Sequence, residues 1–267
     1  MDNYRQPFSI KLVSFCAIFI CKKVIPFLLV LHPVLCMTQT TPFSRGVNLT
    51  QWFEASSPGQ ISFTKFTRQD FINIKSLGCD LIRLPINIQG MTQGEPDHLL
   101  HPVFLMFLDS AVSWAEEQEI YLLLDDHSFV FDPVLSEFSL LETLMINLWS
   151  QLAERYKNRS EYICFEIKNE PHDIPDPTWG SIQGNIIEAI RSIDLNRVLI
   201  VGAADWNTYN NLQYLPEYTY ENLIYTFHFY DPFLFTHQGA EWTDPSMASI
   251  SGIPFPYNSD QMPEMPA

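Results

Sequence analysis

Short apolar runs alternate with segments of helical periodicity between about residue 42 and residue 228 of the 267-residue chain. This alternation is typical of repeated strand–helix units, in which each β-strand lies parallel to the one before it. It therefore predicts an α/β fold built on a parallel sheet. We expect six strands, at residues 46–50, 80–85, 120–126, 162–165, 197–202 and 223–228.

The segments between these strands carry apolar residues at spacings of three and four, which indicates amphipathic helices. The clearest apolar faces lie at residues 71–77, 104–115, 141–152 and 182–193. Thr67 and Asp70 have the spacing of a capping box at the start of the first helix, and Gly78 is suited to its end. Pro102 fits the first turn of the second helix.

Polar residues occur at or just after the end of nearly every expected strand. A doubly wound open sheet alternates in the same way, but it usually has a glycine-rich phosphate loop after its first strand, and no such loop follows Gly46. A ring of functional groups at the strand ends is what the mouth of a (β/α)8 TIM barrel provides, so a barrel is favoured. The polar residues are Asn48, Arg83, His127, Asn169, Glu170, Asn207, His228 and Tyr230.

The fourth strand leads into the sequence EIKNEP at residues 166–171. Side chains alternate between the two faces of a strand, so residues 163, 165 and 167 should face the helices. Cys164, Glu166 and Lys168 should then face the barrel interior, where we expect the two charged groups to pair. Glu170 follows at the tip of the strand, the position at which barrel enzymes place catalytic groups.

A carboxylic acid in a site lined by Trp, Tyr, Asn and His side chains suggests glycoside chemistry. Cleavage of an acetal requires a proton donor, a role that suits Glu170, and a second carboxylate that attacks the sugar or activates water. Trp52, Trp206 and Trp242 are candidates to stack on the flat faces of sugar rings.

The charge balance of the chain bears on its partners. The formal net charge is −16, with 15 Lys and Arg against 31 Asp and Glu, and phosphates would be repelled. We therefore expect no nucleic acid as a partner, and no obligate protein partner is predicted. Outside the first 40 residues the only cysteines are Cys79 and Cys164, which are expected to be buried thiols. No paired metal-ligand spacing is present, so no metal site is expected.

The first 40 residues differ from the rest of the chain. Lys11, Lys22 and Lys23 flank two apolar runs, at residues 12–20 and 24–36. A basic segment followed by an apolar run of this length is typical of a secretory signal peptide, and an uncleaved N-terminal anchor is the alternative. Either interpretation places the domain at residues 41–267 outside the cytoplasm.

Five segments, taken in order, resemble glycoside hydrolase family 5, the cellulase family. They are residues 45–49 (RGVNL), 82–85 (IRLP), 124–127 (LDDH), 165–172 (FEIKNEPH) and 227–230 (FHFY). The resemblance covers residues 43 to about 257. It implies a retaining (β/α)8 enzyme that acts on β-linked glucans or mannans and needs no metal or cofactor.

The resemblance also implies roles for residues at the strand ends. Glu170 matches the catalytic acid/base, and Asn169 matches the residue that binds the sugar 2-hydroxyl. Arg83 matches the arginine that holds the nucleophile carboxylate. The other matches line the substrate site, and they are His127, His228 and Tyr230.

The chain departs from the family pattern after residue 230. The family places its nucleophile, a glutamate, on strand seven and an aromatic platform after strand eight, and no convincing strand follows Tyr230. Glu241 and Glu264 are the only later glutamates, and neither lies in a strand-like setting. We therefore expect a barrel truncated after about six βα units, with the nucleophile absent from the chain and no activity from this chain alone.

Two other functions remain open at this point. The first is a non-catalytic carbohydrate-binding barrel that has lost its nucleophile. The second is a metal-dependent barrel hydrolase, which would use Asp125, Asp126, His127 and His228. The second is disfavoured, because the His-x-His pattern that such barrels carry on strand one is missing.

Overall fold

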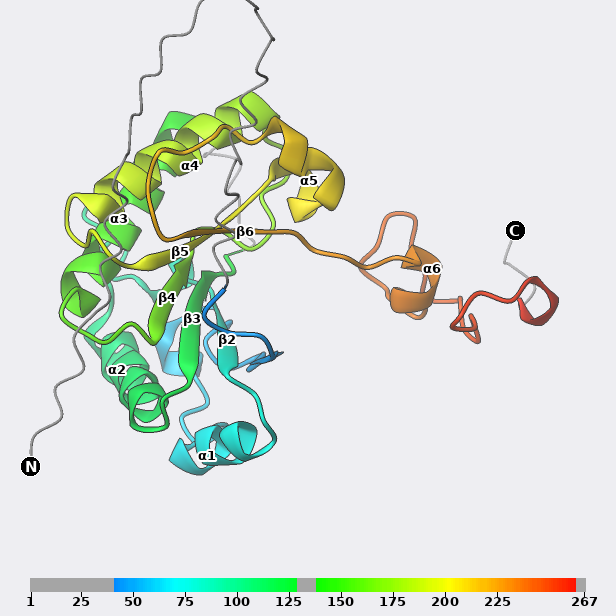
Figure 1. The fold of residues 1–267 in the computed structure, drawn as a ribbon, viewed down its shortest axis with the longest axis horizontal. Helices are drawn as coiled ribbons and strands as arrows, with labels where there is room; N and C mark the ends of the chain where they lie inside the picture. Colours follow the sequence, from blue (N-terminus) through cyan, green and yellow to red (C-terminus); the bar gives the residue numbers. More distant parts are fainter. Residues whose placement is uncertain (1–40, 129–137, 263–267) are drawn as a thin grey trace, which may run out of the picture. The chain divides into compact units, whose positions relative to one another are not determined.

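The computed structural model describes residues 41–128 and 138–262. Within these residues six strands form one sheet, in which each strand is parallel to its neighbours and the spatial order follows the sequence (Figure 1). The predicted strand–helix alternation is therefore confirmed, and each strand lies close to its expected range. The strands are β1 (Gly46–Asn48), β2 (Leu81–Ile86), β3 (Tyr121–Asp126), β4 (Ile163–Glu166), β5 (Val198–Gly202) and β6 (Leu223–Thr226).

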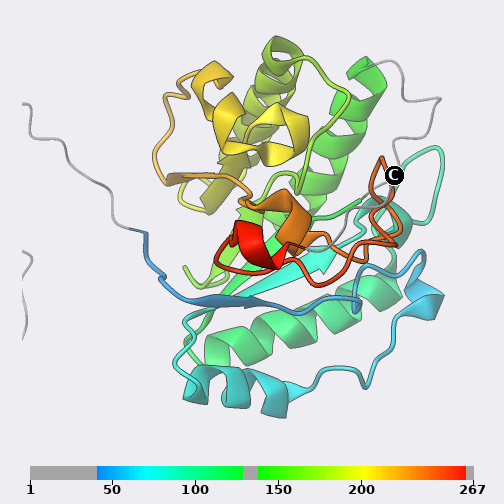
Figure 2. The same ribbon diagram turned by 90° about the vertical axis from the view of Figure 1, so that its right-hand side faces the viewer.

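Four long helices cover one face of this sheet. Helix α1 packs beside α2, and α3 packs beside α4. In the turned view of Figure 2, the first pair lies on one side of β1 and the second pair on the other. The helices are α1 (Arg68–Ser76), α2 (Pro102–Glu117), α3 (Phe138–Tyr156), α4 (Asp176–Arg191) and the single turns α5 (Ala204–Asn207) and α6 (Phe233–Thr236).

The helix ends follow the expected local chemistry. The backbone N–H of Thr67 donates to Oδ2 of Asp70 at 2.7 Å, which closes the predicted capping box of α1. Gly78 ends that helix with a φ of 85°, a left-handed conformation that glycine adopts without a steric penalty. Pro102 occupies the first turn of α2, as predicted.

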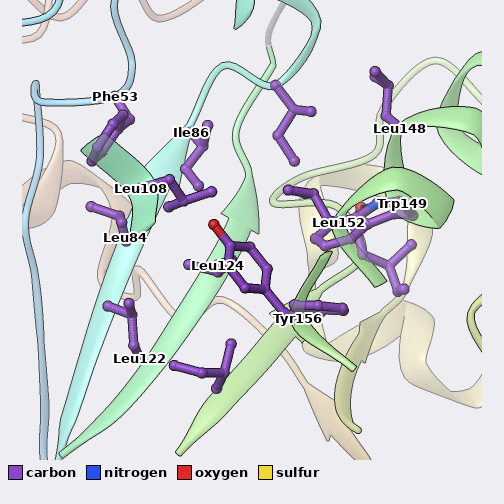
Figure 3. Close-up of a cluster of buried hydrophobic side chains, with 14 of the residues drawn as sticks. Phe53, Leu84, Ile86, Leu108, Leu122, Leu124, Leu148, Trp149, Leu152 and Tyr156 are labelled. Carbon is purple, nitrogen blue, oxygen red and sulfur yellow. Dashed lines mark hydrogen bonds between the residues drawn. The ribbon is translucent and has the colours of Figure 1, made fainter. Parts of the chain in front are cut away.

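The main core lies between the sheet and the helices (Figure 3). Leu84 of β2 and Leu124 of β3 belong to this core together with Tyr156 of α3. Burying a large apolar side chain stabilises the fold by roughly 1.5–3 kcal/mol, so this layer supplies most of the driving force for folding. Further buried members are Ile86, Leu108, Leu122, Leu148, Trp149 and Leu152.

A second, smaller cluster covers the opposite face of the sheet. Leu123, Cys164 and Ile200 are its buried members, and Phe43 packs against it with its ring 5.5 Å from that of Tyr121. Residues 163, 165 and 167 belong to the core on the helical side. The predicted division of the fourth strand between the two faces is thus confirmed.

Residues 229–262 contain no strand, although they gather a small apolar cluster around Met247, Ile250 and Ile253. Across residues 41–128 and 138–262 there is also no helix whose length and hydropathy would suit a membrane span. The expected leader at residues 1–40 lies outside the described residues.

Candidate active site

Arg83, on β2, occupies the centre of a polar network at the carboxyl ends of the first four strands. Its Nε lies 2.6 Å from Oε2 of Glu166, and its Nη2 lies 3.0 Å from Oε1 of the same carboxylate. This two-pronged contact joins β2 to the end of β4. Bidentate pairs of this kind fix orientation as well as charge.

The same guanidinium reaches three further side chains, which come from the end of β3, from the segment just after β4 and from the end of β1. Its Nη2 lies 2.9 Å from Oδ2 of Asp125 and 2.8 Å from Oδ1 of Asn169, and its Nη1 lies 3.2 Å from Oδ1 of Asn48. Burial alone would lower the pKa of Arg83, but the carboxylates of Asp125 and Glu166 outweigh that effect and raise the pKa. The guanidinium therefore stays charged.

Both carboxylates of this network are buried. Burial raises the pKa of the Glu166 carboxyl, Asp125 raises it further, and Arg83 opposes both effects. Asp125 Oδ1 is buried without a hydrogen-bond partner, whereas its Oδ2 contacts Arg83. Because each carboxylate is held by the guanidinium, neither is free to attack a substrate.

The expected pairing of Glu166 with Lys168 is wrong. Glu166 bonds to Arg83, and the Nζ atom of Lys168 lies 3.4 Å from Oδ2 of Asp126. Lys168 also donates to the carbonyl oxygen of Ser128. The alternation of strand four was correctly predicted, but Glu166 pairs with a side chain from β2 and Lys168 with one from β3.

Glu170 lies just beyond β4, and its partner comes from the segment after β6. Its Oε1 lies 2.5 Å from Nδ1 of His228, and both side chains are 17% exposed. The backbone N–H of His228 donates to the carbonyl oxygen of Asn207 at 2.8 Å. Burial raises the pKa of nearby Tyr230, and the Glu170 carboxylate adds to that effect. Glu170, His228 and Tyr230, which were predicted at the ends of strands four and six, therefore lie together in one partly exposed site.

His127 follows β3 and contacts two acids. Its Nδ1 lies 2.6 Å from Oδ2 of Asp125, and its Nε2 lies 3.9 Å from Oε1 of Glu54. The sequence analysis missed Glu54 because it lies in the loop after β1 rather than at a strand end. Its neighbour Phe53 forms an isolated parallel bridge with Ile86, and this bridge brings the loop to the end of β2.

The turn after β5 has an unusual backbone. Asp205, Trp206 and Asn207 have φ values of 55°, 62° and 56°, a run of left-handed conformations that is unfavourable for residues other than glycine. Asn207 is fully buried, and its Oδ1 accepts a hydrogen bond from the backbone N–H of Ala203 at 3.1 Å. An added Cβ at Gly202 would lie 2.5 Å from that oxygen, so glycine is required there.

The Trp206 ring is 49% exposed beside this site. One face stacks on the imidazole of His172, with ring centroids 3.9 Å apart and planes inclined by 2°. The position is compatible with the predicted role of Trp206 as a platform for a sugar ring.

Trp52 has a different environment, and its predicted role is corrected here. Only 1% of its surface is exposed, so a sugar cannot stack on it. Its ring lies 4.5 Å from Phe53, 5.5 Å from Phe66 and 6.4 Å from Trp114. Trp52 is therefore a core residue. Trp242, by contrast, is 77% exposed, with its ring 5.3 Å from that of His237.

Asp125 and Asp126, considered above as metal ligands, instead contact Arg83 and Lys168. Within the described ranges, no three His, Cys, Asp or Glu side chains are arranged to hold a metal ion. What the described site offers is a partly exposed carboxylic acid, a buried cation and an exposed aromatic face. These groups suit the binding and protonation of a neutral polyhydroxylated substrate.

Comparisons with known proteins agree with this chemistry. A family model described as Cellulase (glycosyl hydrolase family 5) matches residues 39–252. Endoglucanase C of Acetivibrio thermocellus is 29% identical over 224 residues, which make up 80% of this chain and 65% of that protein. Endoglucanase 3 of Fibrobacter succinogenes is 30% identical over 232 residues, which make up 80% of this chain and 35% of that protein.

Solved structures give the same result. Thermotoga maritima Cel5A in complex with cellobiose has a TM-score of 0.70 and 29% identity, over 77% of this chain and 67% of that chain. The same protein in complex with mannotriose has a TM-score of 0.69, also at 29% identity. The chain thus spans less than two thirds of the length of the two curated relatives, and its six parallel strands have the arrangement of part of a (β/α)8 barrel.

Proposed function

The chain belongs to glycosyl hydrolase family 5, and on that premise we propose that it forms the acid/base side of a retaining β-glycanase site. One observation carries the proposal. Glu170 lies at the tip of β4, partly exposed and hydrogen-bonded to His228, beside an exposed indole ring. A carboxyl group held in this way can protonate the leaving oxygen of a glycosidic bond.

The neighbouring residues take supporting roles in this proposal. Asn169 would bind the sugar 2-hydroxyl, and its Oδ1 is already oriented by Arg83 at 2.8 Å. The Tyr230 hydroxyl is neutral at physiological pH, as tyrosine ordinarily is, and can donate a hydrogen bond next to the acid. His127 would line the same site through its bond to Asp125.

A retaining mechanism also needs a carboxylate nucleophile about 5 Å from the acid. Asp125 and Glu166 do not meet this need, because both are buried and held by Arg83. Glu241 is described but belongs to none of the ion pairs around Arg83 or Glu170, and Glu264 lies outside the described residues. We therefore propose that the nucleophile is not among the carboxylates of residues 41–128 and 138–262, and that these residues alone do not turn over substrate.

The substrate we propose is a β-linked polysaccharide or oligosaccharide of glucose, as for an endo-β-1,4-glucanase, with a β-mannan as the variant. The similarity to two endoglucanases supports this choice, as do the cellobiose and mannotriose bound by Thermotoga maritima Cel5A. The exposed face of Trp206 supplies a surface for a pyranose ring. We also propose that the domain works outside the cytoplasm, on the strength of the basic and apolar pattern at residues 1–40.

A non-catalytic carbohydrate-binding role is the second candidate. The same observation favours it, since a site with an acid and an aromatic platform but no free attacking carboxylate can still hold a sugar. The two candidates differ only in whether Glu170 meets a nucleophile supplied by other polypeptide.

Two measurements test the proposal. The first is the affinity of the chain for cellotetraose by calorimetry, which we expect to be measurable. The second uses a hybrid protein, in which residues 41–262 are joined to the part of Endoglucanase C that lies beyond its match to this chain. The hybrid should hydrolyse β-glucan, and Glu170→Gln should abolish hydrolysis while sugar affinity stays within a few-fold.

Glu188→Gln is the matched control, because this glutamate is exposed on α4, away from the network. It should leave both measurements unchanged. Undiminished turnover in the Glu170→Gln hybrid would remove Glu170 from its role. A folded hybrid that binds cellotetraose but never hydrolyses β-glucan would favour the binding function.

A further inference from the structure

The segment that carries Glu170 has each of its backbone carbonyls bonded to a different group. The Asn169 carbonyl lies 3.5 Å from Nδ2 of Asn207, and the Pro171 carbonyl accepts from the backbone N–H of Trp206 at 3.0 Å. The carbonyl of Glu170 itself lies 2.9 Å from Nδ1 of His172. A backbone fixed at three successive carbonyls holds the side chain between them in one place.

His172 therefore contacts both functional neighbours at once. A carbonyl oxygen can only accept, so Nδ1 of His172 must carry the hydrogen that reaches Glu170. The flat face of the same imidazole lies 3.9 Å from the Trp206 ring, nearly parallel to it. His172 is thus bonded to the backbone of the proposed acid and supports the back of the proposed sugar platform.

The Trp206 side of this contact is also constrained. Its backbone is left-handed, with a φ of 62°, and is fixed by the bond to Pro171. The ring has one face covered by His172 and remains 49% exposed overall. The Trp206 ring is therefore held on one side by His172, and its backbone is held by Pro171, the residue that follows Glu170.

We propose that His172 is a positioning residue, which sets the place of Glu170 through its Nδ1 hydrogen and the place of the Trp206 platform through its ring. The inference rests on the proposed function, because it concerns the same acid and the same sugar surface. His172 itself does not touch the reacting atoms. The contact with the Glu170 carbonyl and the contact with the Trp206 ring use different parts of the imidazole, so these two contacts can be separated by substitution.

Two variants separate them. His172→Asn keeps a donor nitrogen on Cγ, as Nδ1 is in histidine, but removes the ring. His172→Phe keeps a ring against Trp206 but removes the donor. The matched control is His98→Phe, since His98 pairs with Glu95 on a loop and contacts neither group.

Two readouts on the whole chain report the two contacts. The ¹⁵N chemical shift of Nδ1 of His228 reports its bond to the Glu170 carboxylate, and it needs no sugar and no turnover. The affinity for cellotetraose, measured by calorimetry, reports the Trp206 platform. We expect His172→Phe to move the His228 resonance and to keep the affinity within about twofold, because an aromatic pair is retained.

We expect the opposite pattern from His172→Asn. The His228 resonance should stay in place, and the affinity should fall about fivefold, the usual worth of one aromatic stacking contact. His98→Phe should change neither readout. If His172 served only the stability of the fold, both variants would shift the His228 resonance and weaken the cellotetraose affinity. That result would overturn the inference.

Other outcomes are equally decisive. An unchanged His228 resonance in His172→Phe, or wild-type affinity in His172→Asn, overturns the inference even if the sugar binds. If the wild-type chain binds no cellotetraose, the proposed function fails, and the His228 resonance alone decides whether His172 positions Glu170. If His172→Phe does not fold, His172→Ala is compared with His172→Asn, since both lack the ring and only the asparagine keeps the donor; the His228 resonance should then move in His172→Ala alone.

Discussion

The Nδ1 atom of His228 lies 2.5 Å from the Oε1 atom of Glu170, so residues 58 positions apart form a single acid–imidazole pair. The imidazole comes from the segment after β6 and the acid from the tip of β4. Closure of the sheet from β4 to β6 therefore creates the contact. In the proposed mechanism the imidazole sets the direction of the carboxyl group that delivers the proton.

Removal of this imidazole should damage catalysis more than binding. In the hybrid protein, His228→Phe leaves Glu170 without its partner, and we expect the turnover rate to fall by about 100-fold or more, the usual worth of a positioned acid or base. The affinity for cellotetraose should change only a few-fold. Steady-state kinetics and calorimetry measure the two effects. Equal losses in both would mean that His228 serves the sugar rather than the acid.

The Arg83 network should dominate the stability of the strand ends. Arg83→Met leaves the buried carboxylates of Glu166 and Asp125 without their cation, which should cost about 3–5 kcal/mol in the free energy of unfolding. Arg68→Met is the matched control, because the Arg68–Glu117 pair is about half exposed and worth roughly 0–1 kcal/mol. Urea denaturation compares them, and similar losses would show that the buried network contributes little.

Two of the three tryptophans proposed from sequence as sugar platforms, Trp52 and Trp206, should behave in opposite ways. Trp52→Ala should lower the free energy of unfolding by about 3–5 kcal/mol, because it empties a core site. Trp206→Ala should cost little stability but weaken cellotetraose binding about fivefold or more. Melting curves and calorimetry on both variants check this. Weaker binding by a folded Trp52→Ala variant would restore Trp52 to the site.

Alkaline pH should lower the free energy of unfolding through Cys164, which lies on the face of the sheet opposite the helices. Burial raises the pKa of Cys164 from 9.0 to about 12, so its thiol stays neutral in the folded chain where it would ionise in the unfolded chain. Its contribution to stability is therefore complete below pH 9 and is lost as the pH rises toward 12. The free energy of unfolding should fall by about 1.4 kcal/mol for each pH unit in that window on its account.

The test compares slopes rather than absolute stabilities. Urea denaturation between pH 8.5 and 10 should give a shallower slope for Cys164→Ala than for the wild type. Cys79→Ala, which changes a partly exposed thiol, serves as the control and should keep the wild-type slope. Identical slopes in all three proteins would contradict a buried neutral thiol at position 164.

The strands were predictable from sequence because their apolar runs and their spacing are local properties. The first strand was predicted too long, since the sheet pairing of β1 stops at Asn48, which lies opposite Arg83. The charge pairing of Glu166 was not predictable in the same way. It depends on the register that places Asp125 opposite Glu166, and on a side chain from β2 that reaches across β3.

The aromatic residues show the same limit. Nothing adjacent to Trp52 in the sequence says whether its ring faces the core or the solvent, and packing with Trp114 of α2 decides it. Trp206 is exposed on a left-handed turn, and this turn contains no glycine that would have indicated the conformation from sequence. Glu54 was missed because its loop reaches the site through long-range contacts such as the Phe53–Ile86 bridge. Long-range contacts, not local patterns, select which polar residues become neighbours.

All the side chains that Arg83 holds come from residues 48 to 169, the part of the chain that builds the first four strands. The polar network around Arg83 is thus encoded by one continuous segment of the sequence. A recombination breakpoint placed after Asn169 would separate none of these side chains from Arg83. Recombination at such a point could change the sugar specificity while it keeps the Arg83 network intact.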